Sequence, residues 1–92
     1  MRPHPKRSRR IGAAGYIPKS REVRQLREEM QRTQAEFGAL VYRSAETVGK
    51  WEHDERLCPA DTWEFLCLLH AYPQVERARR LWLEGRADVP LG

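Results

Sequence analysis

Residues 34–52 read QAEFGALVYRSAETVGKWE and carry the clearest structural pattern of the chain. Phe37 and Val41 are four residues apart, and Val48 and Trp51 are three apart. Each half of the stretch therefore presents one apolar stripe to a common core. The spacing predicts two short helices joined by a tight turn.

Polar residues stand at the start of both predicted helices. Thr33 precedes the first helix and Glu36 follows three residues later, which is the pattern of a capping box. Ser44 is placed to cap the second helix. Gly38, inside the first helix, costs about 1 kcal/mol relative to Ala, so it indicates close approach of a neighbouring backbone. These features predict a helix-turn-helix, whose second helix can enter a DNA major groove.

This stretch resembles the helix-turn-helix of the Cro and phage-repressor family (the XRE-like superfamily), and the similarity covers residues 23–69, roughly half the chain. The matching residues are Thr33, Gln34, Phe37, Gly38, Val41, Ser44, Thr47, Val48, Trp51 and Glu52. Two departures fall in the turn, where Tyr42 replaces the family's glycine and Arg43 an apolar residue. A left-handed backbone costs a non-glycine residue about 1–2 kcal/mol. We expect the turn to differ locally, with the core position at Arg43 either filled by its stem or left open.

The resemblance also implies an ion pair between Arg27 and Glu52, at the end of the second helix of the motif. Arg27 belongs to a helix expected over residues 20–31 and capped by Ser20. The core-facing side chains of that helix are Val23, Leu26 and Met30. The pair would fix the angle of the DNA-reading helix and leave part of the guanidinium for a phosphate.

The DNA-reading positions are those opposite Val48 and Trp51 on the second helix, with one residue of the turn added. The expected base-reading residues are Ala45, Glu46, Gly49, Lys50 and Arg43. Lys50 would pair with guanine, Glu46 would accept from cytosine, and Ala45 would contact a thymine methyl. Gly49 would let the helix sit deep. The alternative is that Glu46 and Lys50 form an ordinary surface ion pair four residues apart.

A second group of residues would fix the protein on the DNA backbone without reading sequence. These positioning residues are Thr33, Gln34, Arg27 and Thr47.

The net charge of +4 conceals an asymmetry. Residues 1–21 carry seven Lys and Arg and no acid, while the other 71 residues sum to −3. Residues 1–19 contain three prolines and two glycines and little apolar surface, so a flexible basic arm is expected. Its phosphate or minor-groove contacts would be Arg2, Lys6, Arg7, Arg9 and Arg10. The alternative is a solubilising tail.

The C-terminal half predicts two further helices. Residues 61–70, capped by Asp61, are apolar nearly all round, which is typical of a helix buried on two sides. Thr62, Phe65, Leu66 and Leu69 would fill the core. The second stripe, with Trp63 and Cys67, would meet another subunit or the last helix, expected over residues 74–84. Trp63, Cys67 and Trp82 are assigned to a dimer interface. The alternative for this last helix is a lid on the core.

The expected fold is therefore all-α, with five helices in one helix-turn-helix domain. This domain spans residues 20–85 and lies between the arm, residues 1–19, and a tail, residues 86–92.

Several classes of function are not expected. No apolar run approaches a membrane span, and the basic N-terminus lacks the apolar region of a signal peptide. Two cysteines outside a CxxC motif are typical of reduced thiols in a cytoplasm. The spacings among His53, Cys58, Cys67 and His70 match no familiar zinc finger. No catalytic arrangement or phosphate loop is found. We therefore expect a cytoplasmic protein with no metal, cofactor or enzymatic activity.

The sequence favours a sequence-specific DNA-binding transcriptional regulator, most simply a small dimeric autorepressor of phage or mobile-element type. It would bind a palindromic operator in double-stranded DNA with half-sites about one helical turn (~34 Å) apart. Two alternatives remain open. Residues 65–73 (FLCLLHAYP) resemble a helix ending in antitoxins, which implies a toxin partner. The acidic domain favours a protein-binding adaptor.

Overall fold

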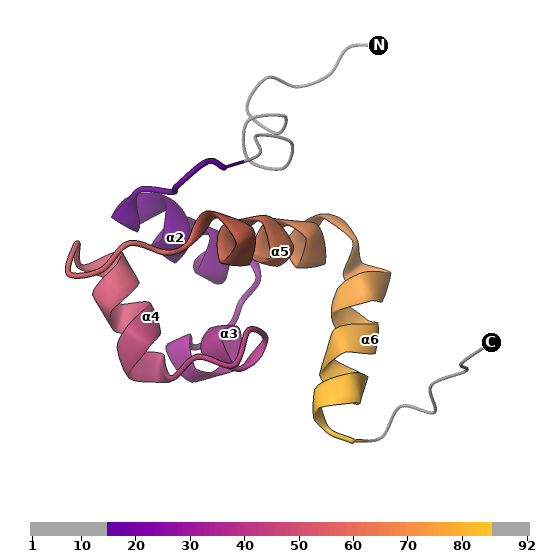
Figure 1. The fold of residues 1–92 in the computed structure, drawn as a ribbon. Coiled ribbons are helices and arrows are strands. Elements are labelled where there is room, and N and C mark those ends of the chain that lie inside the picture. Colours follow the sequence, from indigo (N-terminus) through magenta and orange to yellow (C-terminus); the bar gives the residue numbers. More distant parts are fainter. Residues whose placement is uncertain (1–14, 86–92) are drawn as a thin grey trace, which may run out of the picture.

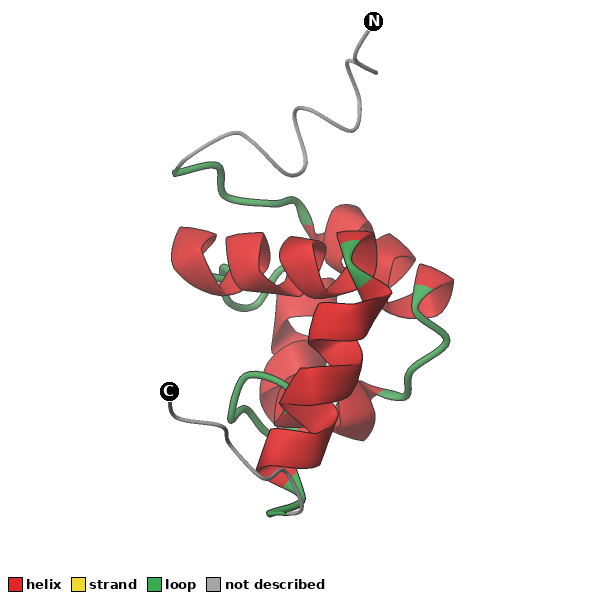
Figure 2. Cartoon of the chain, turned by 90° about the vertical axis from the view of Figure 1, so that its right-hand side faces the viewer, coloured by secondary structure: helices red, strands yellow, loops and turns green. Residues whose placement is uncertain are grey.

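Five helices follow one another through residues 15–85, the part of the chain that this computed structural model describes (Figure 1). The helices are α2 (Ser20–Glu29), α3 (Gln34–Ala39), α4 (Ala45–Glu52), α5 (Ala60–Ala71) and α6 (Pro73–Leu83). No strand occurs among these residues (Figure 2). The predicted all-α fold is confirmed. The arm contacts predicted at Arg2, Lys6, Arg7, Arg9 and Arg10 lie outside the described residues, as does the tail, residues 86–92.

The predicted caps of the helix-turn-helix are present. The Thr33 hydroxyl accepts the backbone N–H of Glu36 at 3.1 Å, and the Glu36 carboxylate accepts that of Thr33 at 2.9 Å. The Ser44 hydroxyl accepts the backbone N–H of Thr47 at 3.1 Å. Both helices of the motif therefore begin where their side chains satisfy open backbone donors.

Two other predicted caps are wrong by one or two residues. Ser20 is the first residue of α2 and donates its hydroxyl to Asp54, while the cap is Lys19, whose N–H donates to the Glu22 carboxylate at 2.8 Å. Asp61 lies inside α5, because Pro59 already holds the extended backbone that a cap requires.

The turn between α3 and α4 folds back tightly onto α3. The Gly38 carbonyl accepts the N–H groups of Val41 and Arg43 at 2.9 and 2.8 Å. A Cβ added at Gly38 would overlap the carbonyl oxygen of Arg43, so the predicted close approach of backbone is confirmed, and the approaching backbone is that of the turn. Tyr42 adopts the left-handed conformation, with φ of 60°. Arg43 is exposed, so its side chain lies on the surface of the turn and does not fill the core.

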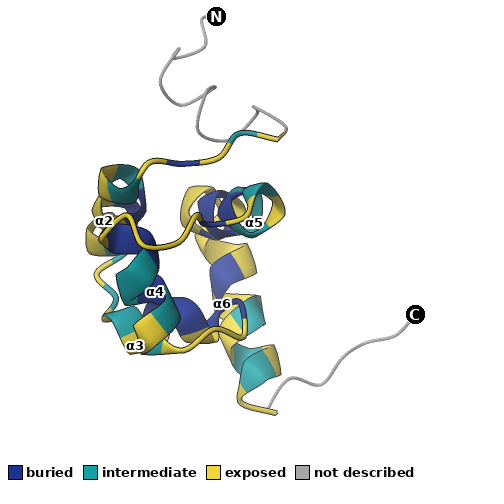
Figure 3. Cartoon of the chain, turned by 60° about the vertical axis from the view of Figure 1, so that its left-hand side comes forward, coloured by how far each residue is buried: buried dark blue, intermediate teal, exposed yellow. Residues whose placement is uncertain are grey.

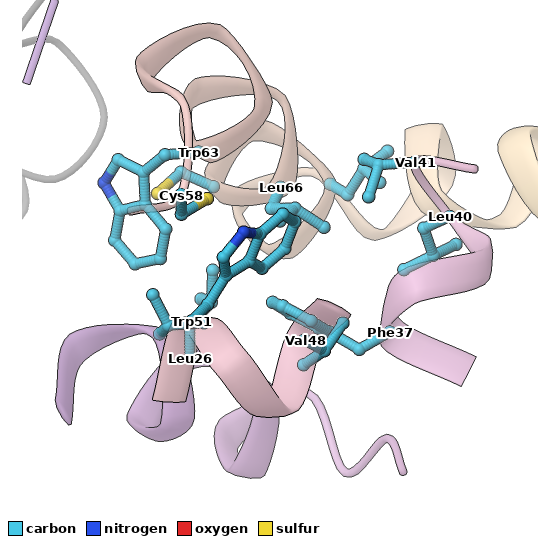
Figure 4. Close-up of a cluster of buried hydrophobic side chains, with 12 residues drawn as sticks. Leu26, Phe37, Leu40, Val41, Val48, Trp51, Cys58, Trp63 and Leu66 are labelled. Atoms are coloured by element: carbon cyan, nitrogen blue, oxygen red, sulfur yellow. The ribbon is translucent and has the colours of Figure 1, made fainter. Parts of the chain in front are cut away.

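An apolar core is enclosed by α2 to α5 (Figure 3). Its members are Val23, Leu26, Phe37, Leu40, Val41, Val48, Trp51, Cys58, Trp63, Leu66, Cys67 and Leu69. Trp51 points from α4 into the middle of this cluster, between Leu26 of α2 and Leu66 of α5 (Figure 4). The stripes predicted for α2, α3 and α4 thus meet in one interior.

Both apolar stripes of α5 face that interior. Trp63 and Cys67 are each only 1% exposed, so their assignment to a dimer interface is wrong. The N-terminal segment adds to the cover of this core, because Pro18 is buried and Tyr16 packs against the cluster. A helix that is apolar on two faces is covered here within a single chain.

Helix α6 attaches differently. It begins with Pro73 and stops at Gly85, a left-handed residue with φ of 70° whose N–H donates to the Trp82 carbonyl at 3.0 Å. Val75 and Trp82 are exposed, Trp82 by 52%. Glu76 is the one buried residue of α6. The apolar stripe formed by Val75, Ala78 and Trp82 therefore faces outward, whereas Leu83 is partly buried and packs against the core, as a lid would.

Candidate nucleic-acid interface

The outer face of α4 is formed by the four positions that the sequence assigned to base reading. Val48 and Trp51 are buried on the opposite side of the helix, which leaves the predicted readers at least partly exposed. These readers are Ala45, Glu46, Gly49 and Lys50. Arg43 is exposed just before the start of α4, so all five predicted residues lie along the turn and one helix face.

The two long polar side chains on this face contact each other. Lys50 Nζ lies 3.7 Å from a Glu46 carboxylate oxygen, and the Glu46 side chain is 80% exposed. Such an exposed pair contributes about 0–1 kcal/mol. The ordinary surface pair considered from the sequence is therefore present. Because it is weak, both side chains can exchange their partner for a ligand at little cost.

Gly49 differs from the other positions on the face. A Cβ added there would meet the side-chain amide of Gln34 at 3.7 and 3.8 Å. Gly49 thus lies against Gln34, at the crossing of α4 with the start of α3, and is not fully open to a ligand. The same amide donates to Glu52 at 3.2 Å, so part of the Gln34 side chain is used inside the domain.

Glu52 is the centre of a buried polar cluster that fixes the end of α4. Arg27 donates two hydrogen bonds to its carboxylate, from Nε at 2.6 Å and from Nη2 at 3.0 Å. Arg24 Nε lies 3.8 Å from the same carboxylate. The Glu52 side chain is only 1% exposed. Paired, bidentate geometry of this kind is what a buried carboxylate requires.

The charge states in this cluster follow from the contacts. Burial alone would raise the pKa of Glu52, but the hydrogen bonds from Arg27 and Gln34 outweigh it and hold that pKa below its ordinary value. The hydrogen bond with Glu52 raises the pKa of Arg27. Both groups are therefore charged at neutral pH.

The pair implied by the family resemblance is present, and Arg27 has little left for a second partner. Its Nη1 donates to the Arg32 carbonyl at 3.1 Å, so each of its three nitrogens already donates within the domain. The side chain is 17% exposed. The expected phosphate contact of Arg27 therefore has less room than the sequence suggested, and its observed role is to hold α4.

Thr33 and Thr47 lie at the starts of α3 and α4, where backbone positioning was expected. Thr33 is exposed and Thr47 is partly exposed. Besides the caps, the Ser44 hydroxyl donates to the Thr47 hydroxyl at 3.2 Å. The capping box occupies the N–H groups of Thr33 and Glu36, so these two amides are not open to a phosphate.

Sequence reasoning missed a hollow of about 820 Å³ beside the C-terminal end of α4. The start of α2 and the loop after α4 line it together, with Lys19, Arg21, Arg24 and Arg56 among the lining residues. Asp54 and Glu55 also lie there. The net negative charge of the domain as a whole did not reveal this local group of basic side chains. The spacing of Arg21 and Arg24, three apart on one helix, was the signal that could have grouped them.

His53 and His70 contact other groups, and Cys58 and Cys67 are buried in the core. His53 Nδ1 lies 2.7 Å from the Gly49 carbonyl oxygen, and His70 lies 3.3 Å from Glu29. Cys58 is buried; burial, with Cys67 nearby, raises the pKa of its thiol to about 12. Within residues 15–85 no group of three or more His, Cys, Asp or Glu is placed to hold a metal ion.

Among the described helices none has the length and apolar character needed to cross a membrane. Comparison of the chain with protein families, with curated proteins and with solved structures found no match. The function must therefore be argued from the residues themselves.

Proposed function

We propose that this chain is a sequence-specific DNA-binding transcriptional regulator that acts in the cytoplasm, with α4 as its reading helix. The observation that carries the proposal is that contacts within the domain hold α4 at both of its ends. Gly38 allows the turn to close on α3, and the Arg27–Glu52 pair fixes the other end of α4. Between these two anchors the outer face of α4 offers Ala45, Glu46 and Lys50 to a ligand, while Gly49 lies against Gln34. This is the arrangement by which a helix-turn-helix of the Cro and phage-repressor type presents its second helix to a major groove.

Base contacts in this proposal come from the turn and the outer face of α4. Lys50 donates to guanine, Glu46 accepts from cytosine and Ala45 contacts a thymine methyl once the Glu46–Lys50 pair opens. Arg43 adds a contact at the edge of the same groove. Phosphates are met by Arg24 and Arg56 beside the hollow and by the basic arm.

The regulator would act as a homodimer on a palindromic operator, because one short reading helix covers few base pairs. With Trp63 and Cys67 in the core, the exposed stripe of α6 is the remaining predicted surface. It consists of Val75, Ala78 and Trp82, all of them exposed. Substituting Glu for Trp82 should leave the fold intact and weaken both self-association and operator binding.

The decisive experiment is DNA binding to the region upstream of the chain's own coding sequence. Footprinting would locate an operator, and fluorescence anisotropy would follow affinity as salt is varied. Lys50→Ala should weaken binding by about 1–3 kcal/mol and relax the preference at one base pair. Arg77→Ala is the matched control, because Arg77 is exposed on α6, away from the proposed reading face.

A second comparison tests the arm. Each neutralised phosphate contributes about −0.9 to the slope of log K against log salt, so deleting residues 1–10 should flatten the slope by about 3 per protomer. Base preferences should survive the deletion. No salt-dependent binding to any upstream fragment, or Lys50→Ala indistinguishable from Arg77→Ala, would contradict the proposal.

One observation favours a second candidate. The described residues carry eleven Lys and Arg against twelve Asp and Glu, a net charge of −1, and the α6 stripe is apolar. A protein-binding module, either an adaptor or the antitoxin of a toxin pair, would use that stripe. A stable complex with the product of an adjacent gene, formed without DNA and lost in Trp82→Glu, would favour it.

A further inference from the structure

Arg79 connects α6 to the turn of the helix-turn-helix. Its Nε donates to the backbone carbonyl of Leu40 at 2.9 Å. Its guanidinium carbon lies 4.9 Å from the centroid of the Tyr42 ring and 5.2 Å from that of the Phe65 ring. One side chain of α6 thus contacts the C-terminal cap of α3, the turn itself and α5.

The hydrogen bond meets a need of α3. The last carbonyls of a helix lack partners within the helix and carry partial negative charge, so a nearby cation stabilises them. Helix α3 has no basic residue in its own last turn, and its cap Leu40 is buried. Arg79, 39 residues further along the chain, supplies both the donor and the charge.

The ring contact meets a need of the turn. Tyr42 has a left-handed backbone that a non-glycine residue adopts only at a cost. Tyr42 is 68% exposed, so core packing does little to hold it there. A guanidinium over the ring face contributes a cation–π attraction. Arg79 is therefore placed to stabilise the conformation that the Tyr42 residue itself disfavours.

Arg79 is held in this position by ion pairs on either side of it along α6. Glu76, one helical turn before Arg79, accepts from Arg32 Nε at 3.1 Å and Nη2 at 2.5 Å. Arg80 Nε lies 3.4 Å from the same carboxylate. The Arg32–Glu76 pair joins α6 to the segment between α2 and α3, while the Arg80–Glu76 pair lies within α6.

We propose that Arg79 is a positioning residue, which locks the turn and thereby sets the start of α4 for DNA. Its role in DNA binding rests on the proposed function, whereas the lock on the turn is a property of the free protein. The two can therefore be tested separately.

The first test is amide hydrogen exchange of the full chain without DNA, followed by NMR. The reporters are the N–H groups of Val41 and Arg43, both of which donate to the Gly38 carbonyl. In Arg79→Ala they should exchange about tenfold faster or more, since a charge-assisted hydrogen bond and a cation–π contact are lost. Amides at the centre of α2, such as that of Leu26, should change little. Arg79→Lys, which keeps the charge, should restore part of the protection, and Arg77→Ala should behave as the parent protein.

Unchanged exchange at Val41 and Arg43 in Arg79→Ala would overturn the lock. Equal acceleration at Leu26 would also overturn it, because Arg79 would then support the whole domain and not the turn. The second test measures operator affinity of the same variants, which should fall in the order parent, Arg79→Lys, Arg79→Ala. If the turn loosens but affinity for an operator is unchanged, the link to DNA is refuted. If the parent protein binds no DNA, the proposed function fails, while the exchange data still decide the lock.

Discussion

Ion pairs between a glutamate and arginines hold two regions of this molecule, but the two glutamates lie in different surroundings. At the end of α4, the Glu52 side chain is 1% exposed and receives hydrogen bonds from Arg27 and Gln34. At the seam of α6, Glu76, whose side chain is 12% exposed, pairs with Arg32 and Arg80. The first pair is embedded beside an apolar core, whereas the second joins α6, a helix whose apolar contact with the core comes from the partly buried Leu83, to the segment before α3.

Because of this difference, α2–α5 and α6 should respond separately to perturbation. Stability from apolar burial and from a desolvated carboxylate is lost only when the core opens. Partly exposed ion pairs contribute less and can be replaced by water. We therefore expect α6 to loosen before the helix-turn-helix unit does, and four changes test this order.

The largest effect should come from the core. Trp51→Ala should lower the free energy of unfolding by about 3–5 kcal/mol, because the indole fills the centre of the α2–α5 interior. Trp82→Ala is the matched control, since Trp82 is half exposed on α6 and its loss should change stability little. Urea unfolding of both variants measures the contrast. Equal effects would mean that the two regions are not distinct.

The second-largest effect should come from Glu52→Gln, which should lower the free energy of unfolding by about 1.5–3 kcal/mol, the range for hydrogen bonds to charged groups. The pKa of Glu52 is lower in the fold than its ordinary value of 4.5. The stability that it contributes is therefore fully present above about pH 4.5 and is lost as the pH falls through the lowered pKa. Thermal melts across that acid range should show a flatter pH dependence in Glu52→Gln than in the parent. Glu46→Gln, at an exposed site on the same helix, should retain the parental slope.

Glu76→Gln should have a smaller global effect, about 1 kcal/mol, because Arg32 and Arg80 can both turn to solvent. Its local effect should be larger. Amide exchange along α6 should accelerate while the amides of α4 keep their protection. Acceleration of α4 to the same extent would show that α6 is an integral part of the core unit.

The smallest effect on stability should come from the reading face. Lys50→Ala should change the free energy of unfolding by no more than about 0.5 kcal/mol, because its ion pair with Glu46 is exposed. A larger loss, measured by the same urea titration, would mean that Lys50 supports the fold and would weaken its case as a DNA contact.

The sequence predicted the parts of this structure that depend on local spacing. The stripes containing Phe37, Val41, Val48 and Trp51 and the caps at Thr33 and Ser44 follow from helix periodicity and from the needs of helix ends. The pairing of Arg27 with Glu52 came from the family resemblance. Together these define the helix-turn-helix and the orientation of its outer face.

What the sequence did not predict depends on contacts between distant elements. Periodicity identified two apolar stripes on α5, but it could not say whether another chain or the same chain covers Trp63 and Cys67. It also could not show that α6 faces the domain with Glu76 and Arg79, because their partners Arg32 and Leu40 lie about 40 residues away with no repeating pattern between them. The cost of a left-handed backbone at Tyr42 led to the expectation of a locally different turn. The structure instead keeps Tyr42 in that conformation, next to Arg79, which the sequence did not place there.

The two glycines of the helix-turn-helix give the motif unequal tolerance of natural variation. At Gly38 a single added methyl group would collide with the backbone of the turn, and backbone cannot rotate away as a side chain can. At Gly49 the same methyl group would meet only the flexible amide of Gln34 at an ordinary distance, and alanine is the better helix former. In a saturation library, position 38 should accept glycine alone, whereas position 49 should accept alanine. The residues of the reading surface can therefore change and adapt to new operators, while the glycine that faces the turn must be kept.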